Sequence, residues 1–307
     1  MPEGHTIHRL ALDLERDLGG QKLAVSSPQG RFTAASRLDG GVLRRAHAVG
    51  KHLFLDLGDA RVHVHLGLFG KFRRRRPGEP PGPNVRLRLV GGERIWDLTG
   101  PTACELMDDD AYGALRSRLG GDPLAEGPRP AATWTRVRAS RRAIGALLLD
   151  QSIFAGIGNV YRAELLFLVG VHPDTPGRDV SKAQFEDLWR RAKELLRAGV
   201  RANRIVTVPL AERRDAPRSR REQLYVYRRT ACRRCGSRIA RAPSAARTIY
   251  FCPTCQRPTR SASARPERNA PSTRPPAAQS PPTPTRTSSS KTPSTARGSR
   301  GRAKAQR

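Results

Sequence analysis

Two closely spaced pairs of cysteines limit the folds open to this chain more than any other feature of its sequence. Cys232 and Cys235 form one C-x2-C pair, Cys252 and Cys255 form a second, and sixteen residues separate the two pairs. This spacing is typical of a zinc site in which four thiolates surround one metal ion. Because four thiolates leave no open coordination position, we expect one structural zinc ion that organises a hairpin and takes no part in bond breaking.

Arg247 and the fifth cysteine complete this interpretation. Arg247 lies five residues before Cys252, where a β-turn can present its guanidinium group to a phosphate. Cys104 stands outside the set of four, and we expect it to be a small buried hydrophobic residue. Since the five cysteines are odd in number and no secretory signal is present, the sequence does not predict a disulfide framework.

The chain carries a large excess of positive charge. Its 307 residues include 57 Lys and Arg against 27 Asp and Glu, which gives a formal net charge of +30. Such an excess indicates a polyanionic partner, most often nucleic acid. No apolar run reaches the roughly 18 residues of a membrane span, and the N-terminus does not resemble a signal peptide. We therefore expect a cytoplasmic, nucleoid-associated protein with no membrane partner.

The first eighteen residues predict a helix. Apolar residues recur there at spacings of three, four and seven: Ile7, Leu10, Ala11, Leu14 and Leu18. They form one stripe of an amphipathic helix that Gly19 and Gly20 close, so the helix should dock on a core.

Pro2, just ahead of this helix, is a candidate nucleophile. Removal of Met1 leaves Pro2 with a secondary α-amine, whose pKa near ~8, against ~10.4 for lysine, keeps a useful fraction unprotonated at neutral pH. Attack by such an amine on a sugar C1′ gives a positively charged iminium, the electron sink of covalent amine catalysis. Glu3 stands beside it as an acid or base. The alternative is an ordinary chain start in which both residues merely precede a helix.

Hydrophobic periodicity divides the chain into a β-rich first half and a helical second half. Strands are predicted within residues 22–57, most clearly at 52–57, and then at 61–66 and in a hairpin over 84–96. A stretch rich in Gly and Pro at residues 120–132 predicts a domain boundary. Helices are predicted at residues 144–149, 161–168 and 182–196.

The chain is expected to consist of four segments with different structures. They are an N-terminal domain at residues 1–120, a helical domain at 133–224, the cysteine finger at 225–257 and a tail at 258–307. The tail consists of Pro, Ser, Thr, Ala and Arg with almost no large apolar residue. Such a composition cannot bury a core, so we expect the tail to be disordered.

A glycine-containing turn lies between two of the predicted helices. The first helix ends near Gln151 and the second begins at about Asn159. Gly156 and Gly158 let a phosphate approach backbone amides at the positive end of the second helix, where Asn159 can cap the helix or bind the phosphate. No strand precedes the turn, which disfavours a dinucleotide-binding fold. The alternative is a plain helical hairpin.

Four of these features together resemble one enzyme family. They are Pro2-Glu3-Gly4, Gly50-Lys51-His52-Leu53, the turn at residues 150–159 and the four-cysteine finger. They occur in the order found in the formamidopyrimidine-DNA glycosylase and endonuclease VIII family, over residues 1 to about 257. The resemblance implies an α+β fold with an N-terminal β-sandwich and flanking helices. A C-terminal helical domain with a helix-two-turn-helix and the zinc finger follows, and DNA lies between the two.

The resemblance also implies roles for individual residues. Pro2 matches the family's Schiff-base nucleophile and Glu3 its acid/base partner. Lys51 matches the lysine that assists β-elimination and contacts phosphate. Arg247 matches the finger arginine that binds the phosphate beside the lesion and assists δ-elimination, and Asn159 matches the turn asparagine that holds the DNA backbone.

Two further DNA contacts follow from the resemblance. Arg118 matches a family DNA contact. The stretch from His65 to Gly70 resembles the loop that fills the gap left by an extruded base, with Gly67, Leu68 and Phe69 as candidate contacts and the two apolar side chains as wedges. The alternative for this stretch is a continuing core strand. His63 and His65 share a strand face, where packing or phosphate contact is a better explanation than metal binding.

The resemblance predicts a bifunctional DNA glycosylase and AP lyase of base excision repair, which cleaves the strand by β,δ-elimination. Pro2-Glu3-Gly4 favours oxidised pyrimidines, because it resembles the endonuclease VIII branch. The alternatives are an oxidised-purine glycosylase and a non-catalytic protein that binds damaged DNA. We expect a monomer that acts on damaged double-stranded DNA, with single-stranded DNA as a further candidate.

Overall fold

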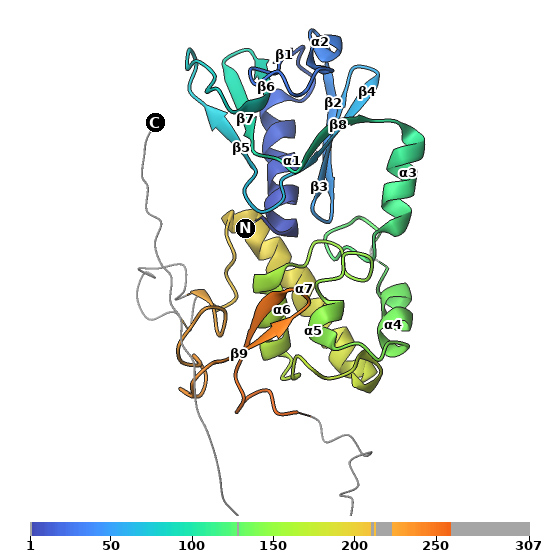
Figure 1. Ribbon diagram of the computed structural model, residues 1–307, viewed down its shortest axis with the longest axis vertical. Coiled ribbons are helices and arrows are strands. Elements are labelled where there is room, and N and C mark those ends of the chain that lie inside the picture. The colour runs from blue at the N-terminus through green and yellow to red at the C-terminus, as the bar shows by residue number, and fades with distance from the viewer. Residues whose placement is uncertain (1, 128, 210–211, 213–222, 259–307) are drawn as a thin grey trace, which may run out of the picture. The chain divides into compact units, whose positions relative to one another are not determined.

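The N-terminal helix α1 spans Gly4–Leu18 and buries the whole apolar stripe that the sequence predicts. The structure is a computed structural model that describes residues 2–127, 129–209, 212 and 223–258. The tail predicted to be disordered therefore lies outside the described residues from position 259 onward. In Figure 1, α1 begins beside the helices of the second half and runs along the strands of the first.

Two four-stranded antiparallel sheets pack around α1. One sheet has the order β1 (Ala24–Ser26), β6 (Val85–Gly91), β7 (Arg94–Thr99), β5 (Lys71–Arg75), and the other has β2 (Leu43–Val49), β3 (His52–Leu57), β4 (Ala60–His65), β8 (Ala103–Met107). Apolar side chains from α1 and from both sheets form one core, and Cys104 packs against it. Two short helices, α2 (Ala35–Leu38) and α3 (Asp109–Arg118), flank the strands. The predicted β-sandwich with flanking helices is confirmed.

The second half is helical. It contains α4 (Pro130–Arg138), α5 (Ile144–Leu147), α6 (Asn159–Leu168), the short 3-10 helix η1 (Gly177–Asp179) and α7 (Lys182–Ala202). Ser181 and Gln184 form a capping box at the start of α7, and Asn203 ends it with a left-handed backbone. Among the described residues, no helix is long and apolar enough to cross a membrane.

A two-stranded hairpin carries the cysteine finger. Strands β9 (Ala240–Ser244) and β10 (Arg247–Phe251) pair antiparallel, and only Ala245 and Ala246 connect them. Both alanines have positive φ, 49° and 58°, which is the requirement of a type I′ turn that follows the twist of the strands. The hairpin packs on α6 (Figure 1).

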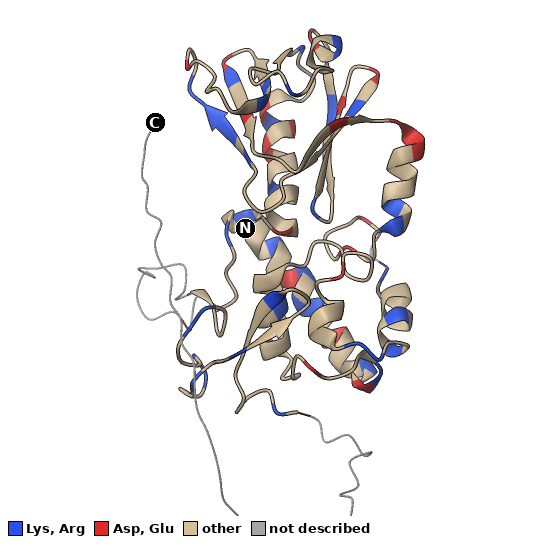
Figure 2. Ribbon diagram, viewed as in Figure 1, with Lys and Arg blue, Asp and Glu red and all other residues tan. Residues whose placement is uncertain are grey.

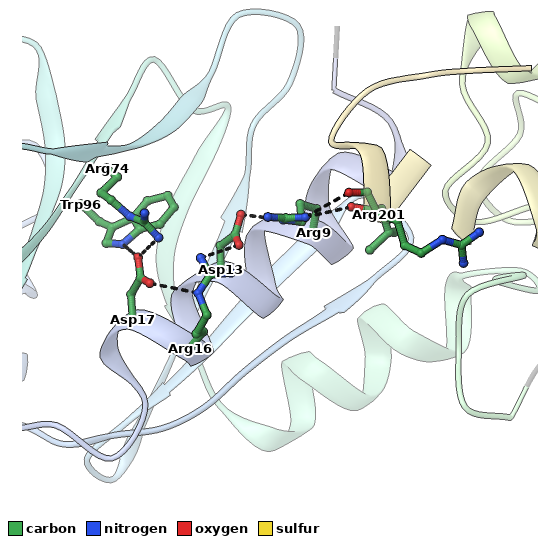
Figure 3. Close-up of polar contacts among 8 residues, drawn as sticks. Arg9, Asp13, Arg16, Asp17, Arg74, Trp96 and Arg201 are labelled. Atoms are coloured by element: carbon green, nitrogen blue, oxygen red, sulfur yellow. Dashed lines mark hydrogen bonds and ion pairs between the residues drawn. The ribbon is translucent and has the colours of Figure 1, made fainter. Parts of the chain in front are cut away.

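A chain of polar contacts along α1 joins the first sheet to the end of α7 (Figure 3). From the sheet to the helix, its members are Trp96, Arg74, Asp17, Arg16, Asp13 and Arg9. Arg9 then donates to the backbone carbonyls of Val200 and Arg201, each at 3.3 Å. These carbonyls lie in the last turn of α7, where the helix has a negative end and unpaired acceptors. The two halves of the chain are therefore held together through α1.

Several elements were not predicted. Strand β5 has four basic residues in five positions (Figure 2), so the alternation of apolar residues that reveals a strand is missing. Helix α3 buries only Leu115, and α4 buries only Thr133 and Val137, so neither shows a continuous apolar stripe. Helix α4 begins inside the stretch at residues 120–132 that predicted a boundary. The proposed domain limits stay a prediction.

Candidate active site

Glu3 is fully buried at the N-terminus of helix α6. Its carboxylate accepts backbone N–H groups from Gly158 at 3.0 Å, Val160 at 2.9 Å and Tyr161 at 3.4 Å. The first N–H groups of a helix have no acceptor within the helix, and they attract an anion. An acidic side chain from the start of the chain therefore caps a helix that begins more than 150 residues later.

Glycines in the turn before α6 make this approach possible. The N–H of Gly4 donates to the carbonyl of Gly156 over 2.8 Å. Gly156 has a φ of +92°, a conformation that glycine adopts readily. A Cβ atom on Gly158 would overlap the carboxylate carbon of Glu3. The two turn glycines, which the sequence analysis connected with phosphate approach, here admit the first residues of the chain.

Burial raises the pKa of Glu3 above its usual value, because the charged carboxylate loses its hydration. The positive charge of Lys51 and the three backbone hydrogen bonds act in the opposite direction but do not cancel the effect of burial. Glu3 therefore keeps a proton at higher pH than a solvated glutamate does, as a proton donor requires.

Lys51 lies in the turn between β2 and β3 and reaches the same place. Its Nζ donates to the carbonyl of Ile157 at 2.6 Å. Burial lowers the pKa of Lys51 to about 8; the charge of Glu3 opposes this shift and that of Arg247 adds to it. Near neutral pH, Lys51 thus has a far larger neutral fraction than a solvated lysine.

Asp122 fixes this turn against α1. Its carboxylate accepts the N–H of Gly50 at 2.7 Å and bonds the imidazole Nε2 of His8 at 3.0 Å, while its other oxygen accepts the N–H of Leu124 at 2.8 Å. Gly50 has a φ of +58°, in the left-handed region. Asp122 was not predicted as a site residue, because nothing in the local sequence pattern indicates these distant partners.

Pro2 borders two cavities. The larger, of about 1270 Å³, is lined by residues from both halves, including His5, Arg9, Phe69 and Arg228. The smaller, of about 410 Å³, is lined by Lys51 among others. A group bound in either cavity is therefore within reach of the start of the chain.

Asn159 and Arg247 line both cavities as well. Asn159 is the first residue of α6, and its Nδ2 donates to the carbonyl of Thr248 at 3.0 Å. Arg247 follows the alanine turn as the first residue of β10, and its side chain is exposed. The structure thus brings together Pro2, Glu3, Lys51, Asn159 and Arg247.

The segment predicted to be a wedge is an exposed loop. Strand β4 ends at His65, and Leu68 and Phe69 are 48% and 82% exposed. Both side chains line the larger cavity. Gly67, with a φ of +62°, turns the chain here. The alternative of a continuing core strand is wrong, because the chain leaves the sheet after His65.

His65 was not predicted as a site residue. Its side chain lines the smaller cavity, and its Nδ1 accepts the N–H of Gly67 at 3.2 Å. A neutral imidazole with an accepting Nδ1 carries its proton on Nε2, so it remains a donor. His63, on the same strand, instead bonds Glu105 at 2.9 Å and His52 at 2.9 Å. The one signal for His65 was its position next to the loop.

Arg118 is not brought to these cavities. It is exposed at the last position of α3 and lines neither of them. Its charge still acts on His52, since Arg118 is among the groups that lower the pKa of that histidine.

The four finger cysteines converge. Their Sγ atoms lie within 4.8 Å of one another, with 4.0 Å between Cys232 and Cys255 and 3.5 Å between Cys235 and Cys252. A tetrahedral zinc with Zn–S bonds of about 2.3 Å requires an S–S separation of about 3.8 Å. The donor set therefore fits a metal ion. Cys104 is remote from them and only partly buried, packed against the core of the two sheets, where burial raises the pKa of its thiol to about 12.

Comparison with known proteins agrees with the geometry. Residues 1–98 match the family model of the formamidopyrimidine-DNA glycosylase N-terminal domain, and residues 119–209 match that of the formamidopyrimidine-DNA glycosylase H2TH domain. Endonuclease 8 1 of Mycobacterium tuberculosis is 46% identical over 267 residues, which cover 83% of this chain and 100% of the relative. Formamidopyrimidine-DNA glycosylase of Geobacter metallireducens is 29% identical over 83% of this chain and 100% of the relative.

The solved structures agree in fold. Lactococcus lactis Fpg (MutM), in complex with DNA containing N7-benzyl-Fapy-dG, superposes with a TM-score of 0.71. The match covers 83% of this chain and 100% of that one at 24% identity. The chain therefore belongs to the formamidopyrimidine-DNA glycosylase and endonuclease VIII family of DNA glycosylases and AP lyases.

Proposed function

We propose that this DNA glycosylase excises oxidised pyrimidines from damaged double-stranded DNA through a Schiff base on Pro2. The observation that carries the proposal is that Pro2 borders two cavities, next to the buried Glu3 carboxylate and the partly buried Lys51 side chain. The pyrimidine preference rests on Pro2-Glu3-Gly4 and on 46% identity to a relative named endonuclease 8 1. An oxidised-purine substrate remains the alternative.

In the proposed reaction, the unprotonated amine of Pro2 attacks C1′ of the damaged nucleotide. The C1′–N bond to the base breaks, and its electron pair leaves with the base, which takes a proton. The nitrogen of Pro2 then loses its proton and the C1′–O4′ bond breaks, which opens the sugar ring and leaves an iminium. Glu3 supplies the protons that the base and O4′ take up, a role that its raised pKa favours. The resulting iminium withdraws electrons, so that a C2′ proton can leave and the 3′ C–O bond can break.

The cations around Pro2 serve the phosphates in this proposal. Lys51 and Arg247 bind and stabilise the anionic oxygens as each phosphate leaves in β- and δ-elimination. Asn159 holds the DNA backbone. A zinc ion on Cys232, Cys235, Cys252 and Cys255 would supply structural rigidity to the hairpin, since four thiolates saturate it.

Borohydride trapping tests the nucleophile. Reduction in the presence of an abasic duplex should yield a protein–DNA adduct, and peptide mapping should find it on residue 2. An uncleaved N-terminal extension removes the secondary amine without touching any other site residue, and it should abolish the adduct. Undiminished trapping with the blocked terminus would refute Pro2 as the nucleophile.

Substrate choice needs a lesion panel. Oxidised pyrimidines and oxidised purines in double-stranded and single-stranded DNA should separate the two enzyme hypotheses, with faster single-turnover excision of pyrimidines expected in duplex DNA. Preference for purines would support the alternative. Binding without excision of any lesion, despite a free Pro2, would instead support the non-catalytic damage-binding hypothesis.

Metal content tests the finger. Protein purified without chelator should contain one zinc ion per chain, and Cys252→Ser should lose it and bind DNA more weakly. Arg247→Ala should retain zinc while its products shift from δ- toward β-elimination. If Arg247→Ala also lost zinc, the separation of a structural metal from a phosphate-binding arginine would fail.

A further inference from the structure

Arg162 is a fully buried cation that the proposed reaction does not use. It lies in α6 one turn after Asn159 and is 0% exposed. Its Nη1 donates to the carbonyl of Gly145 at 3.0 Å, and its Nη2 donates to Oδ1 of Asn159 at 2.6 Å. Nη1 also contacts the carbonyl of Ser244 at 3.4 Å and its hydroxyl at 3.3 Å. Arg162 thus touches three separate segments: α5, the start of α6 and the finger hairpin.

The partners of Arg162 do not neutralise its charge. Within the described part of the chain, no carboxylate forms an ion pair with it, and its Nε is buried without a hydrogen-bond partner. Burial lowers the pKa of Arg162 to about 10, and Arg247 adds to this effect while Glu3 opposes it. The group is therefore still a cation at neutral pH. Burying a charge without an ionic partner is unfavourable, so a buried guanidinium group at this position calls for a physical reason.

One reason is the orientation of the Asn159 side chain. Arginine can only donate, so the amide atom 2.6 Å from Nη2 must be Oδ1. The carbonyl of Thr248 can only accept, so the atom 3.0 Å from it must be Nδ2. With its oxygen engaged by Arg162, Asn159 keeps one N–H of Nδ2 for the cavities that it lines. A spare N–H donor is what a phosphate oxygen requires.

The second reason is the position of the finger hairpin. Ser244 is the last residue of β9 and pairs directly with Arg247 across the two-alanine turn. By holding the carbonyl and hydroxyl of Ser244, Arg162 fixes the base of the turn that carries Arg247. Two phosphate contacts of the proposed function, one on α6 and one on the finger, therefore depend on the same guanidinium group.

The charges around the smaller cavity are unbalanced in the same sense. Lys51, Arg142 and Arg247 line this cavity, and its one lining carboxylate, Asp150, forms an ion pair with Arg142 at 2.8 Å. Arg162 lies behind Asn159, and the buried Glu3 acts on both Lys51 and Arg162, so the cations still outnumber the acids. A bound anion would correct this imbalance. A DNA phosphate has the required charge and acceptor oxygens.

We propose that Arg162 is a positioning residue for DNA binding. It orients Asn159 as an N–H donor and fixes the hairpin that carries Arg247, so that both residues can contact a phosphate of the DNA backbone. The inference rests on the proposed function and adds a residue that acts through Asn159 and Arg247 without touching DNA. Its loss should weaken phosphate binding even though no cavity-lining residue is changed.

A double-mutant cycle tests the proposal, with a duplex containing a tetrahydrofuran abasic analogue as the probe. Arg162→Gln in the full chain should raise the Kd about tenfold, as expected for members of one hydrogen-bond network. In an Asn159→Ala background, the same substitution should raise Kd by a clearly smaller factor. Equal factors in both backgrounds would overturn the role through Asn159.

Two further variants distinguish a loss of positioning from a loss of folding or of positive charge. Arg162→Lys retains the charge but cannot reach all three segments, so it should fold yet fail to restore full affinity. Arg190→Gln removes one positive charge from the exposed face of α7, outside both cavities, and should leave Kd nearly unchanged. Full affinity in Arg162→Lys would show that charge alone matters and would refute positioning.

The analogue cannot form a Schiff base, so this test is separate from that of the proposed chemistry. If wild-type protein binds the analogue but is not trapped by borohydride, the proposed function fails and the Arg162 inference is still judged by the cycle. Single-turnover excision at saturating enzyme should change less than Kd in Arg162→Gln, because Pro2, Glu3 and Lys51 are intact. A loss confined to the excision rate, with Kd unchanged, would contradict the inference.

Discussion

The carboxylate of Glu3 lies so close to the backbone of Gly158 that it leaves no space for a side chain at position 158. The Gly158 N–H donates to Glu3 over 3.0 Å, and there is no room for a Cβ atom between them. A glycine at this position is therefore required by the acid that it binds. The geometry of the candidate proton donor depends on a residue without a side chain.

Gly158→Ala should disrupt the site through this contact. Overpacking of a buried position typically costs about 1–3 kcal/mol, so we expect a lower unfolding midpoint together with a strong loss of base excision. Gly113→Ala is the matched control, because a Cβ there, in helix α3, meets no atom within 4 Å. It should be neutral or stabilising by up to about 1 kcal/mol. Thermal unfolding and single-turnover excision measure both effects; equal behaviour of the two variants would contradict this account.

Glu3→Gln should separate the two activities. Only base excision needs a proton delivered to the departing base, so excision should fall much more than cleavage of a preformed abasic site. The comparison uses single-turnover rates on a lesion duplex and on an abasic duplex. Equal losses on the two substrates would argue against Glu3 as the proton donor.

Lys51 should make DNA binding depend on pH near 8. Its pKa is lowered to about 8, below the ordinary 10.5, so Lys51 in the free enzyme loses its positive charge as the pH rises through this value. Phosphate binding favours the charged form, and affinity for an abasic-analogue duplex should therefore fall between about pH 7.5 and 9. Lys51→Arg keeps its charge over this range and should show a smaller fall. Identical pH profiles would rule out Lys51 as the titrating group.

Phe69→Ala should impair excision without affecting stability. The side chain is 82% exposed and lines the larger cavity, so truncation removes little buried area. Extrusion of a base costs a few kcal/mol of unstacking, and loss of a group that fills the gap should slow excision from a duplex by about tenfold or more. Single-stranded substrate has no stack to fill and should be cleaved at the wild-type rate. Leu12→Ala, 59% exposed on α1 and outside both cavities, is the control for loss of an exposed apolar side chain.

The basic tail should act as a non-specific tether. Residues 258–307 hold eleven Lys or Arg and one Glu, so they contribute +10 to the net charge of +30. The tail has no aromatic residue to stack on bases, and each phosphate that it neutralises should add about −0.9 to the slope of log K against log salt. Deletion should flatten this slope on undamaged duplex and leave saturating single-turnover excision unchanged. An unchanged slope would indicate an extension without a role in DNA binding.

Local periodicity was enough to predict much of the fold. The stripe of α1 and the alternation in β3 and β4 were visible because one face of each element carries a regular series of buried apolar residues. The cysteine spacing likewise predicted the cluster. Strand β5 and helix α3 were missed because they bury few apolar residues.

The part of the site that could not be predicted from the sequence consists of contacts between distant segments. No local pattern connects Asp122 with Gly50 and His8, or Arg162 with Ser244. Pro2, Glu3 and Lys51 were predicted because a family resemblance supplies their roles, whereas the supporting residues act through hydrogen bonds that only the folded chain reveals. Of the residues that the family motifs indicated, Pro2, Lys51, Asn159 and Arg247 line the cavities and Arg118 does not. The structure adds the contacts that hold them.

The capping of α6 by Glu3 has a consequence for protein synthesis. A ribosome makes Pro2 and Glu3 first, but the amides that bind Glu3 belong to residues 158, 160 and 161. In a nascent chain, Glu3 thus lacks the backbone N–H donors that hold its carboxylate until more than half of the polypeptide has been translated. Fragments that stop before α6 should carry an accessible amine with only the reactivity of an ordinary peptide terminus.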